Sequence, residues 1–115
     1  MKRGEIWMIN LDPTVGAEIR KTRPVVIVSS DDMGVLPLKV VAPITDWKEH
    51  YSEVPWMTKI IPTSQNGLEK PSSCDAFQVR SVSVERFIRK LGILDSRIMK
   101  AISDSLADVL EIKPA

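Results

Sequence analysis

The chain has 115 residues, of which 43% are hydrophobic and 27% are charged, a balance typical of one soluble globular domain, expected over residues 1–115. Its net charge of +1 provides no long-range field that would attract nucleic acid or a membrane, so a polyanion site must come from local clustering of cations. No apolar run is long enough to cross a bilayer, and the N-terminus lacks a signal-peptide core. With a single cysteine, Cys74, an intrachain disulfide is excluded, and we expect a cytoplasmic protein.

The first half of the chain predicts three strands. Residues 5–11 alternate around Trp7 and end in Asp-Pro turn chemistry. Residues 24–29 and 38–44 are apolar runs rich in β-branched side chains, which favour buried strands. Pro43 lies near the end of the third run and argues for a sheet edge or a bulge there.

The second half predicts shorter elements and one helix. Residues 46–56 are polar and aromatic and indicate an exposed connection. Asp95 or Ser96 can cap a helix, and the apolar residues from Ile98 to Leu110 follow at helical spacing. The remaining predicted elements are strands over 57–61 and 88–91, a long and less regular strand over 73–82, a tight turn at Asn66-Gly67 and one helical turn over 83–87.

These elements predict a mainly β fold. Five to seven short strands accompany one amphipathic helix, which must pack on a sheet or on a partner. Because no βαβ alternation is present, we expect a small, mostly antiparallel β-barrel or curled sheet with a C-terminal helix.

Several kinds of site are excluded by residue type. A zinc site requires three or four converging ligands, and the chain has one histidine, His50, and one cysteine. The adjacent carboxylates Asp31 and Asp32 are typical of a solvated turn rather than a magnesium site. No glycine-rich phosphate loop is present. We therefore expect neither a metal nor a cofactor.

The most informative stretch, residues 16–28, joins a charged loop to an apolar strand. The loop carries the carboxylate of Glu18 and ends at Arg23, the third of its cations. Pro24 biases Arg23 towards extended geometry, so a cation is held at the mouth of a buried strand. This arrangement suits anion binding or catalysis. The simpler alternative is a solvated loop that leads into a strand.

Metal-independent cleavage of RNA is chemistry that these residues permit. The 2′-hydroxyl must lose a proton, negative charge on phosphorus must be stabilised, and the 5′-oxygen must be protonated as it leaves. Arginine supplies a planar fork for phosphate oxygens, and threonine adds a neutral hydrogen bond. Arg23 and Thr45 each lie at a strand end, so adjacent strands could bring them to one rim, where Glu18 could orient Arg23 or act on a proton.

Aromatic side chains interleaved with a lysine follow Thr45. Single-stranded RNA is bound by aromatic faces that stack on bases and by cations that follow the backbone. The alternative is that the tryptophans cover the core. The residues of this possible platform are Trp47, Lys48, His50, Tyr51 and Trp56.

Three segments resemble the N-terminal signature of the MazF/PemK family, the toxins of bacterial toxin–antitoxin pairs. They are residues 3–7 (RGEIW), 10–18 (NLDPTVGAE) and 23–29 (RPVVIVS). Residues 41–45 are similar to the family's third strand with its threonine, and residues 78–82 to its Q-x-R segment. The resemblance implies an SH3-like barrel that works as a homodimer.

The resemblance also implies a function. It is that of a ribosome-independent, metal-independent endoribonuclease that cleaves single-stranded mRNA at short sequences, leaving 2′,3′-cyclic phosphate and 5′-hydroxyl ends. Its partner would be an antitoxin with an acidic tail. The family's essential arginine falls on Arg23, its threonine on Thr45 and its loop glutamate on Glu18. With the loop cations and the aromatic platform, the candidate RNA-binding residues are Arg20, Lys21, Trp47, Lys48, Gln78 and Arg80.

The chain also departs from the family pattern. Ile19 stands where the loop usually has glutamine, Lys21 where it has glycine, and Phe77 where some members have a carboxylate. On a regular strand Asp75 would share a face with Phe77 and could substitute for that carboxylate. Two alternatives stay open: a CcdB-like barrel that poisons a topoisomerase through residues 112–115, and a non-catalytic RNA-binding barrel.

Overall fold

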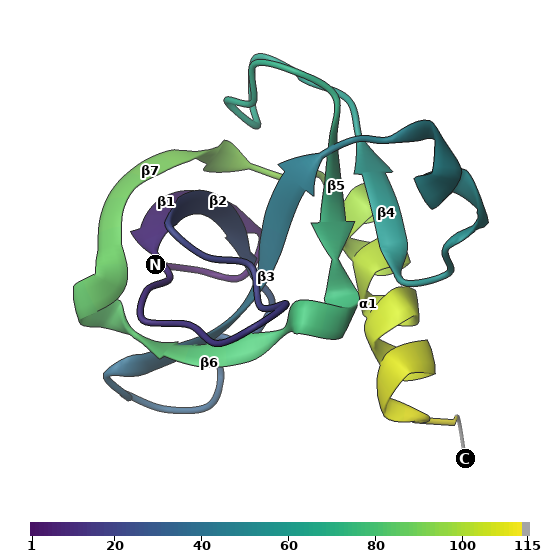
Figure 1. The fold of residues 1–115 in the computed structure, drawn as a ribbon. Coiled ribbons are helices and arrows are strands. Elements are labelled where there is room, and N and C mark those ends of the chain that lie inside the picture. The colour runs from purple at the N-terminus through teal and green to yellow at the C-terminus, as the bar shows by residue number, and fades with distance from the viewer. Residues whose placement is uncertain (114–115) are drawn as a thin grey trace.

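Seven strands and one C-terminal α-helix form the fold within residues 1–113, which are the residues that this computed structural model describes (Figure 1). Pro114 and Ala115, part of the segment considered for topoisomerase docking, lie outside the described residues. The mainly β prediction with a C-terminal helix is confirmed. The strands are β1 (Glu5–Asn10), β2 (Thr22–Ile27), β3 (Leu38–Asp46), β4 (Met57–Ile60), β5 (Ser72–Asp75), β6 (Arg80–Ser83) and β7 (Phe87–Ile93); three 3-10 turns, η1 (Glu49–Glu53), η2 (Ala76–Gln78) and η3 (Val84–Arg86), precede the helix α1 (Ser96–Leu110).

All ladders between the described strands are antiparallel, in the order β4-β5-β3-β2-β1-β7, with β6 also paired to β3. The path β7-β1-β2-β3-β6 curls strongly round a core, whereas β4 and β5 lie beside α1 (Figure 1). Within residues 1–113 no ladder joins β6 to β7. Neighbouring residues of β2 enter two different clusters, Val25 the cluster inside the curl and Val26 the one facing α1. Since both faces are buried, the unbroken apolar run of β2 is explained.

Pro43 lies in an interior strand, so of the two settings predicted for it, a sheet edge or a bulge, the sheet edge is wrong. On one side β3 pairs with β2, where Pro43 faces Val25. On its other side β3 pairs first with β6, up to Val41, and then with β5, from Ile44. Pro43 falls in the gap between these two ladders, where its missing N–H removes no ladder bond.

The predicted strand over 73–82 is two strands separated by η2. The carboxylate of Asp75 accepts a hydrogen bond from the Phe77 N–H (3.0 Å), and this contact turns the chain out of β5. The predicted strand over 88–91 is longer than expected, because β7 follows β1 as far as Ile93 and includes Gly92. The helical turn predicted over 83–87 is confirmed as η3.

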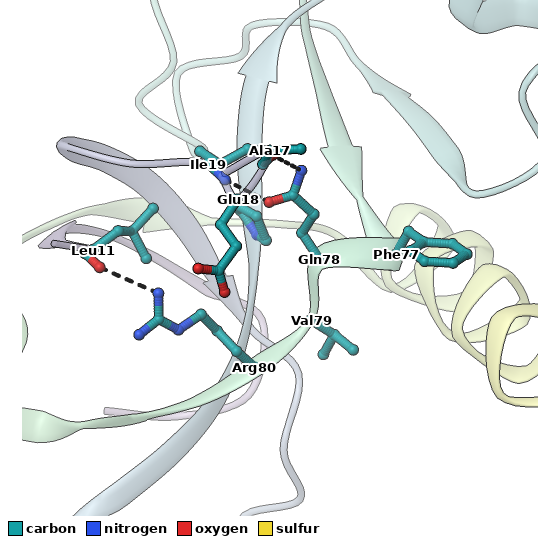
Figure 2. Close-up of a pocket in the computed structure, with 9 residues that line it drawn as sticks. Leu11, Ala17, Glu18, Ile19, Phe77, Gln78, Val79 and Arg80 are labelled. Atoms are coloured by element: carbon teal, nitrogen blue, oxygen red, sulfur yellow. Dashed lines mark hydrogen bonds between the residues drawn. The ribbon is translucent and has the colours of Figure 1, made fainter. Parts of the chain in front are cut away.

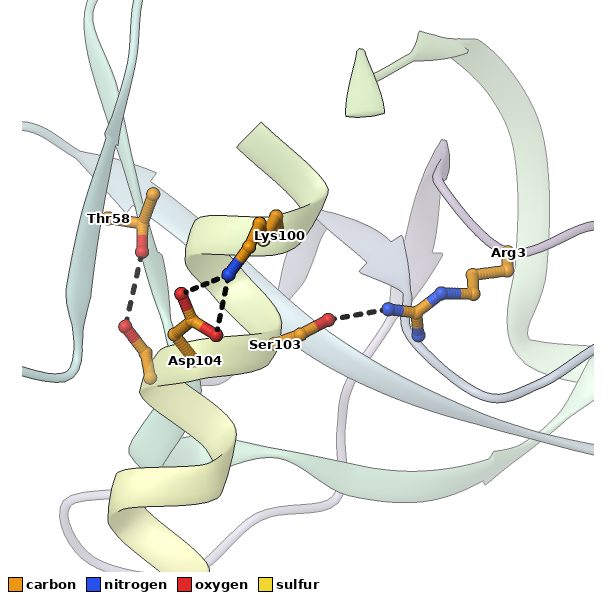
Figure 3. A network of polar contacts seen from close by, with 6 residues as sticks. Arg3, Thr58, Lys100, Ser103 and Asp104 are labelled. Atoms are coloured by element: carbon orange, nitrogen blue, oxygen red, sulfur yellow. Dashed lines mark hydrogen bonds and ion pairs between the residues drawn. The ribbon is translucent and has the colours of Figure 1, made fainter. Parts of the chain in front are cut away.

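The helix α1 is capped and anchored as its sequence suggested. Asp95 Oδ1 accepts a hydrogen bond from the Ile98 N–H (2.8 Å), and Met99 and Ile102 are buried. Polar contacts fix the helix from two sides (Figure 3). Arg3 donates to Ser103 Oγ (2.6 Å) and to the carbonyl of β2's neighbour Val28, while Ser105 Oγ donates to the Pro55 carbonyl (3.2 Å). Within residues 1–113, no helix combines the length and apolar character needed to span a bilayer.

Glu5, the first residue of β1, is a buried carboxylate with compensating partners. It accepts a hydrogen bond from Trp7 Nε1 (2.9 Å), and its Oε2 lies 3.2 Å from Lys90 Nζ. Burial alone would raise the pKa of Glu5, but these contacts, a backbone hydrogen bond from Lys2 and the N-terminal ammonium group outweigh it. They lower its pKa from 4.5 to about 2.

Acidification is therefore expected to remove the stabilisation by Glu5 between about pH 4.5 and pH 2. A carboxyl group whose pKa is lower in the folded state stabilises fully above its unfolded pKa and loses that effect as pH falls through its folded pKa. Glu5→Gln should lower the free energy of unfolding by about 1–3 kcal/mol at pH 7. Urea unfolding of both proteins should show this difference shrinking towards pH 2; a difference independent of pH would contradict the prediction.

Candidate functional site

Strands β2 and β3 bring Arg23 and Thr45 to one pocket of about 320 Å³. The two strands pair in the register Val25 opposite Pro43. Continuing that register by two residues sets Arg23 opposite Thr45, just beyond the last ladder pair. Both side chains are half-buried. The expectation that adjacent strands would bring these two residues to one rim agrees with this geometry.

The lining of this pocket is rich in charge. Besides Arg23 it includes the cations Lys70 and Arg89 and the carboxylates Asp46 and Glu69. Lys70 Nζ lies 3.1 Å from Asp46 Oδ2, so these two charges largely neutralise each other. The lining as a whole therefore retains positive charge.

Arg23 is positioned by the backbone around it. Its N–H and carbonyl lie within β2, which pairs with β1 through Ile9. Its Nε donates to the carbonyl of Arg20 (3.3 Å), which leaves the outer edge of the guanidinium for a ligand. A guanidinium and a hydroxyl at one rim can hold a tetrahedral oxyanion such as a phosphodiester. Within residues 1–113, no group of three His, Cys, Asp or Glu side chains is placed to hold a metal ion.

Glu18 lines a second pocket, of about 460 Å³, whose lining includes neither Arg23 nor Thr45. Figure 2 shows this second pocket. Its carboxylate accepts a hydrogen bond from the Val15 N–H within the loop between β1 and β2. Figure 2 shows this carboxylate extending into the pocket towards Arg80. The structure therefore places Glu18 and Arg23 in the linings of two different pockets, although they are five residues apart in the sequence.

Gln78 and Arg80 hold the backbone of the loop between β1 and β2. The Ile19 N–H donates to Gln78 Oε1 (2.5 Å), and Gln78 Nε2 donates to the Ala17 carbonyl (3.4 Å). Arg80 Nη1 donates to the Leu11 carbonyl (3.2 Å). Both residues were predicted to bind RNA, and their polar groups here fix the loop that carries Glu18 (Figure 2).

The structure explains how this loop accommodates Ile19 and Lys21, two residues that depart from the family pattern. Ile19 packs its side chain against the cluster inside the curled sheet. Lys21 adopts a left-handed conformation with φ of 71°, which accounts for the glycine usual at this position. Of the loop's other cations, Arg20 is exposed. Apolar packing therefore adds to the hydrogen bonds that hold the loop.

The predicted aromatic platform is divided into two groups. Trp47 meets Tyr51 edge to face (5.8 Å between centroids), and Tyr51 meets His50 (4.6 Å). Lys59 Nζ lies 4.9 Å from the centre of the Trp47 ring and occupies one of its faces. Lys48, also predicted to bind RNA, is exposed at the start of η1, and Trp56 pairs instead with Phe77 (5.3 Å).

Asp75 and Phe77 do not share a face, because β5 ends between them. Asp75 is buried and caps η2, whereas the Phe77 side chain is 62% exposed. Burial raises the pKa of Asp75, and its hydrogen bonds with the Phe77 and Gln78 backbone oppose that rise. The carboxylate therefore acts as a cap in this structure rather than as a substitute for the group missing at position 77.

Arg89 and Lys70 were not anticipated as members of the site. The alternation of a strand implies that Arg89 and Lys90 face opposite sides, but the sequence does not tell which of them faces Arg23. That information lies in the pairing of β7 with β1, which joins residues about eighty positions apart. Lys70 reaches the pocket from the loop that precedes β5.

The similarity of this chain to known proteins extends over the pocket of Arg23 and Thr45 and over both strands, β2 and β3, that carry them. Residues 2–110 match the family model described as PemK-like, MazF-like toxin of type II toxin-antitoxin system. The chain is 29% identical over 112 residues to the endoribonuclease MazF9 of Mycobacterium tuberculosis, covering 92% of each protein. Its fold is similar to that of MazF from Deinococcus radiodurans (TM-score 0.81, 21% identity, 97% of each chain). It is also similar to a mycobacterial endoribonuclease in complex with its cognate antitoxin (TM-score 0.78, 17% identity, 100% of this chain and 99% of the other).

Proposed function

Because the chain belongs to the PemK-like and MazF-like toxins of type II toxin–antitoxin systems and is an endoribonuclease of that family, we propose that it cleaves single-stranded mRNA at short sequences. Cleavage would need neither a ribosome nor a metal ion. The products would carry 2′,3′-cyclic phosphate and 5′-hydroxyl ends. Such a substrate fits a cytoplasmic toxin.

The observation that supports this proposal most directly is the pocket shared by Arg23 and Thr45. Attack of the 2′-oxygen on phosphorus expels the 5′-oxygen, while one proton leaves the 2′-hydroxyl and another reaches the leaving oxygen. No water is consumed, so the reaction requires charge stabilisation and proton transfer alone. The Arg23 guanidinium would bind the non-bridging oxygens as negative charge develops, and the Thr45 hydroxyl would donate to the same phosphate.

Glu18 is the proposed group for orienting Arg23 or moving a proton. In the structure described above, its loop is held by Gln78, Arg80 and the packing of Ile19. Catalysis by Glu18 would therefore require the loop to exchange these contacts for contacts with RNA. Arg20 and Lys21, carried on the same loop, would meet the RNA backbone in that rearrangement, and Trp47 and Lys48 would meet nucleotides beyond Thr45.

The proposed protein partners are a second copy of the chain and an antitoxin with an acidic tail. The acidic tail would lie over the cationic pocket and exclude RNA. A homodimer would cover part of the exposed apolar surface, in which Trp56 and Phe77 are 36% and 62% exposed. A strictly monomeric mass in solution at micromolar concentration would contradict the dimer.

The proposed activity is tested by incubating a long single-stranded RNA with the purified protein in EDTA and mapping the new ends. We expect cuts at a recurring short sequence, with 5′-hydroxyl and 2′,3′-cyclic phosphate ends. RNA binding without cleavage would favour the non-catalytic alternative. Growth arrest by a protein that neither binds nor cuts RNA would favour topoisomerase poisoning.

A further inference from the structure

Two consecutive cations of β7 have different surroundings. Lys90 lies opposite Trp7, and its Nζ is 3.2 Å from the buried carboxylate of Glu5. Arg89 faces the other side of the strand and lines the pocket of Arg23. Its side chain is exposed and forms no ion pair with any residue in the range 1–113. Lys90 thus has a structural partner, whereas Arg89 is available to a ligand.

The pairing of three strands sets Arg89 two strands away from Pro24, the neighbour of Arg23. Met8 of β1 lies opposite Pro24 on one side and opposite Arg89 on the other, and all three line the pocket. Because neighbouring strands are about 4.8 Å apart, the backbones of Pro24 and Arg89 are separated by roughly 10 Å. Arg23, next to Pro24 in β2, and Arg89 of β7 therefore line one pocket from the two strands that flank β1.

The ladder between β1 and β7 is irregular on both sides of this cation pair. Met8 and Ile9 pair with Arg89 and Phe87, which leaves Ile88 as an extra residue. A second shift, next to Lys90, leaves Leu91 unpaired. Bulges of this kind bend a strand and re-aim its side chains, and they are frequent beside active sites. The strand is thus locally distorted where Arg89 enters the pocket.

Arg89 also accounts for the net positive charge of the pocket lining. The lining contains three cations and two carboxylates, and Lys70 is paired with Asp46. Glu69 offsets one of the two remaining cations. Without Arg89 the lining would be neutral overall, in a protein whose net charge is only +1.

We propose that Arg89 binds a second backbone phosphate of the RNA, adjacent to the phosphate held by Arg23 and Thr45. The inference rests on the proposed function, since it names how the same pocket takes its substrate. A single strand presents one phosphate per nucleotide, so two cations in one pocket fix the path of two successive phosphates through it. Met8 of β1 adds an apolar side chain to the same lining.

The test is binding of a single-stranded RNA that carries 2′-O-methyl groups throughout, which removes the nucleophile and prevents cleavage. Affinity is measured over a range of salt concentrations for the wild type, Arg89→Ala, Arg89→Lys and Arg97→Ala. Arg97 is an exposed arginine of α1 and serves as the matched control for a lost charge. Arg89→Ala should bind on the order of tenfold more weakly at low salt. Its slope of log affinity against log salt should fall by about 0.7, the value for one phosphate contact on a single strand.

The remaining variants separate a phosphate contact from a structural effect. Arg89→Lys should recover most of the affinity and the slope, and Arg97→Ala should match the wild type. Wild-type affinity and slope in Arg89→Ala, with a wild type that cleaves unmodified RNA, would overturn this inference and leave the proposed function intact. A wild type that neither binds nor cleaves RNA would overturn both. Should Arg89→Ala unfold, Arg89→Gln keeps the side-chain length while removing the charge and gives the same readout.

Discussion

Arg23→Ala is expected to lose cleavage of single-stranded RNA by about 10²–10³-fold while keeping its fold. Removal of one preorganised donor to a developing oxyanion typically costs this much in rate. Arg23 lines a pocket, and only its backbone takes part in the ladder with Ile9 of β1. Alanine preserves that ladder, so the loss should appear in rate and not in the unfolding transition. Initial rates in EDTA and a thermal unfolding curve measure the two quantities.

Two further variants show whether the charge or its geometry matters. Arg23→Lys keeps the positive charge but loses the planar fork, and it should recover only part of the rate. Arg97→Ala removes an exposed arginine of α1 and should cleave as fast as the wild type. Undiminished cleavage by Arg23→Ala would remove Arg23 from the mechanism, whatever the fate of the other proposals.

The local elements of the fold could be predicted from the sequence, because their signals are local. The apolar run of β2, the capped amphipathic pattern of α1 and the turn at Asn66-Gly67 each depend on residues within a few positions. The division of the predicted strand over 73–82 was missed. That strand breaks because β5 and β6 pair with different parts of β3, and these partner segments are about thirty and about forty residues away in the sequence.

The same limit applies to the candidate site: residues placed by local patterns could be predicted, and residues placed by distant strand pairing could not. Arg23 and Thr45 each lie at a strand end, so their meeting required only that β2 and β3 be neighbours. Glu18 is close to Arg23 in sequence but is carried into another pocket, since Gln78 fixes its loop from a distant part of the chain. Arg89 enters through the pairing of β7 with β1, which no local pattern specifies.

Gly67→Ala is expected to destabilise the protein by about 3–5 kcal/mol. Gly67 has φ of +70°, and a Cβ added there would lie 2.1 Å from the carbonyl oxygen of Leu91 in β7. The backbone of the loop between β4 and β5 is therefore packed closely against the backbone of β7 at Gly67. A side chain at this position must push the loop away, which also disturbs the pocket wall formed by Leu68 and Lys70. The melting temperature should fall by more than about 10 °C.

Three glycines allow backbone strain to be separated from crowding. Gly34 has φ of +83° with no atom within 4 Å of an added Cβ, so Gly34→Ala should cost only about 1 kcal/mol through strain. Gly92 has no such φ, but its added Cβ would lie 2.2 Å from the Gln65 carbonyl, so Gly92→Ala measures crowding without that strain. If the close approach of the loop to β7 stabilises the fold, the loss in Gly67→Ala should be near the sum of the other two losses. A loss of stability in Gly67→Ala no larger than that in Gly34→Ala would show that the loop moves away from β7 at little cost in free energy. The loop would then not be rigid enough to hold Lys70 in the pocket lining with Arg23 and Thr45.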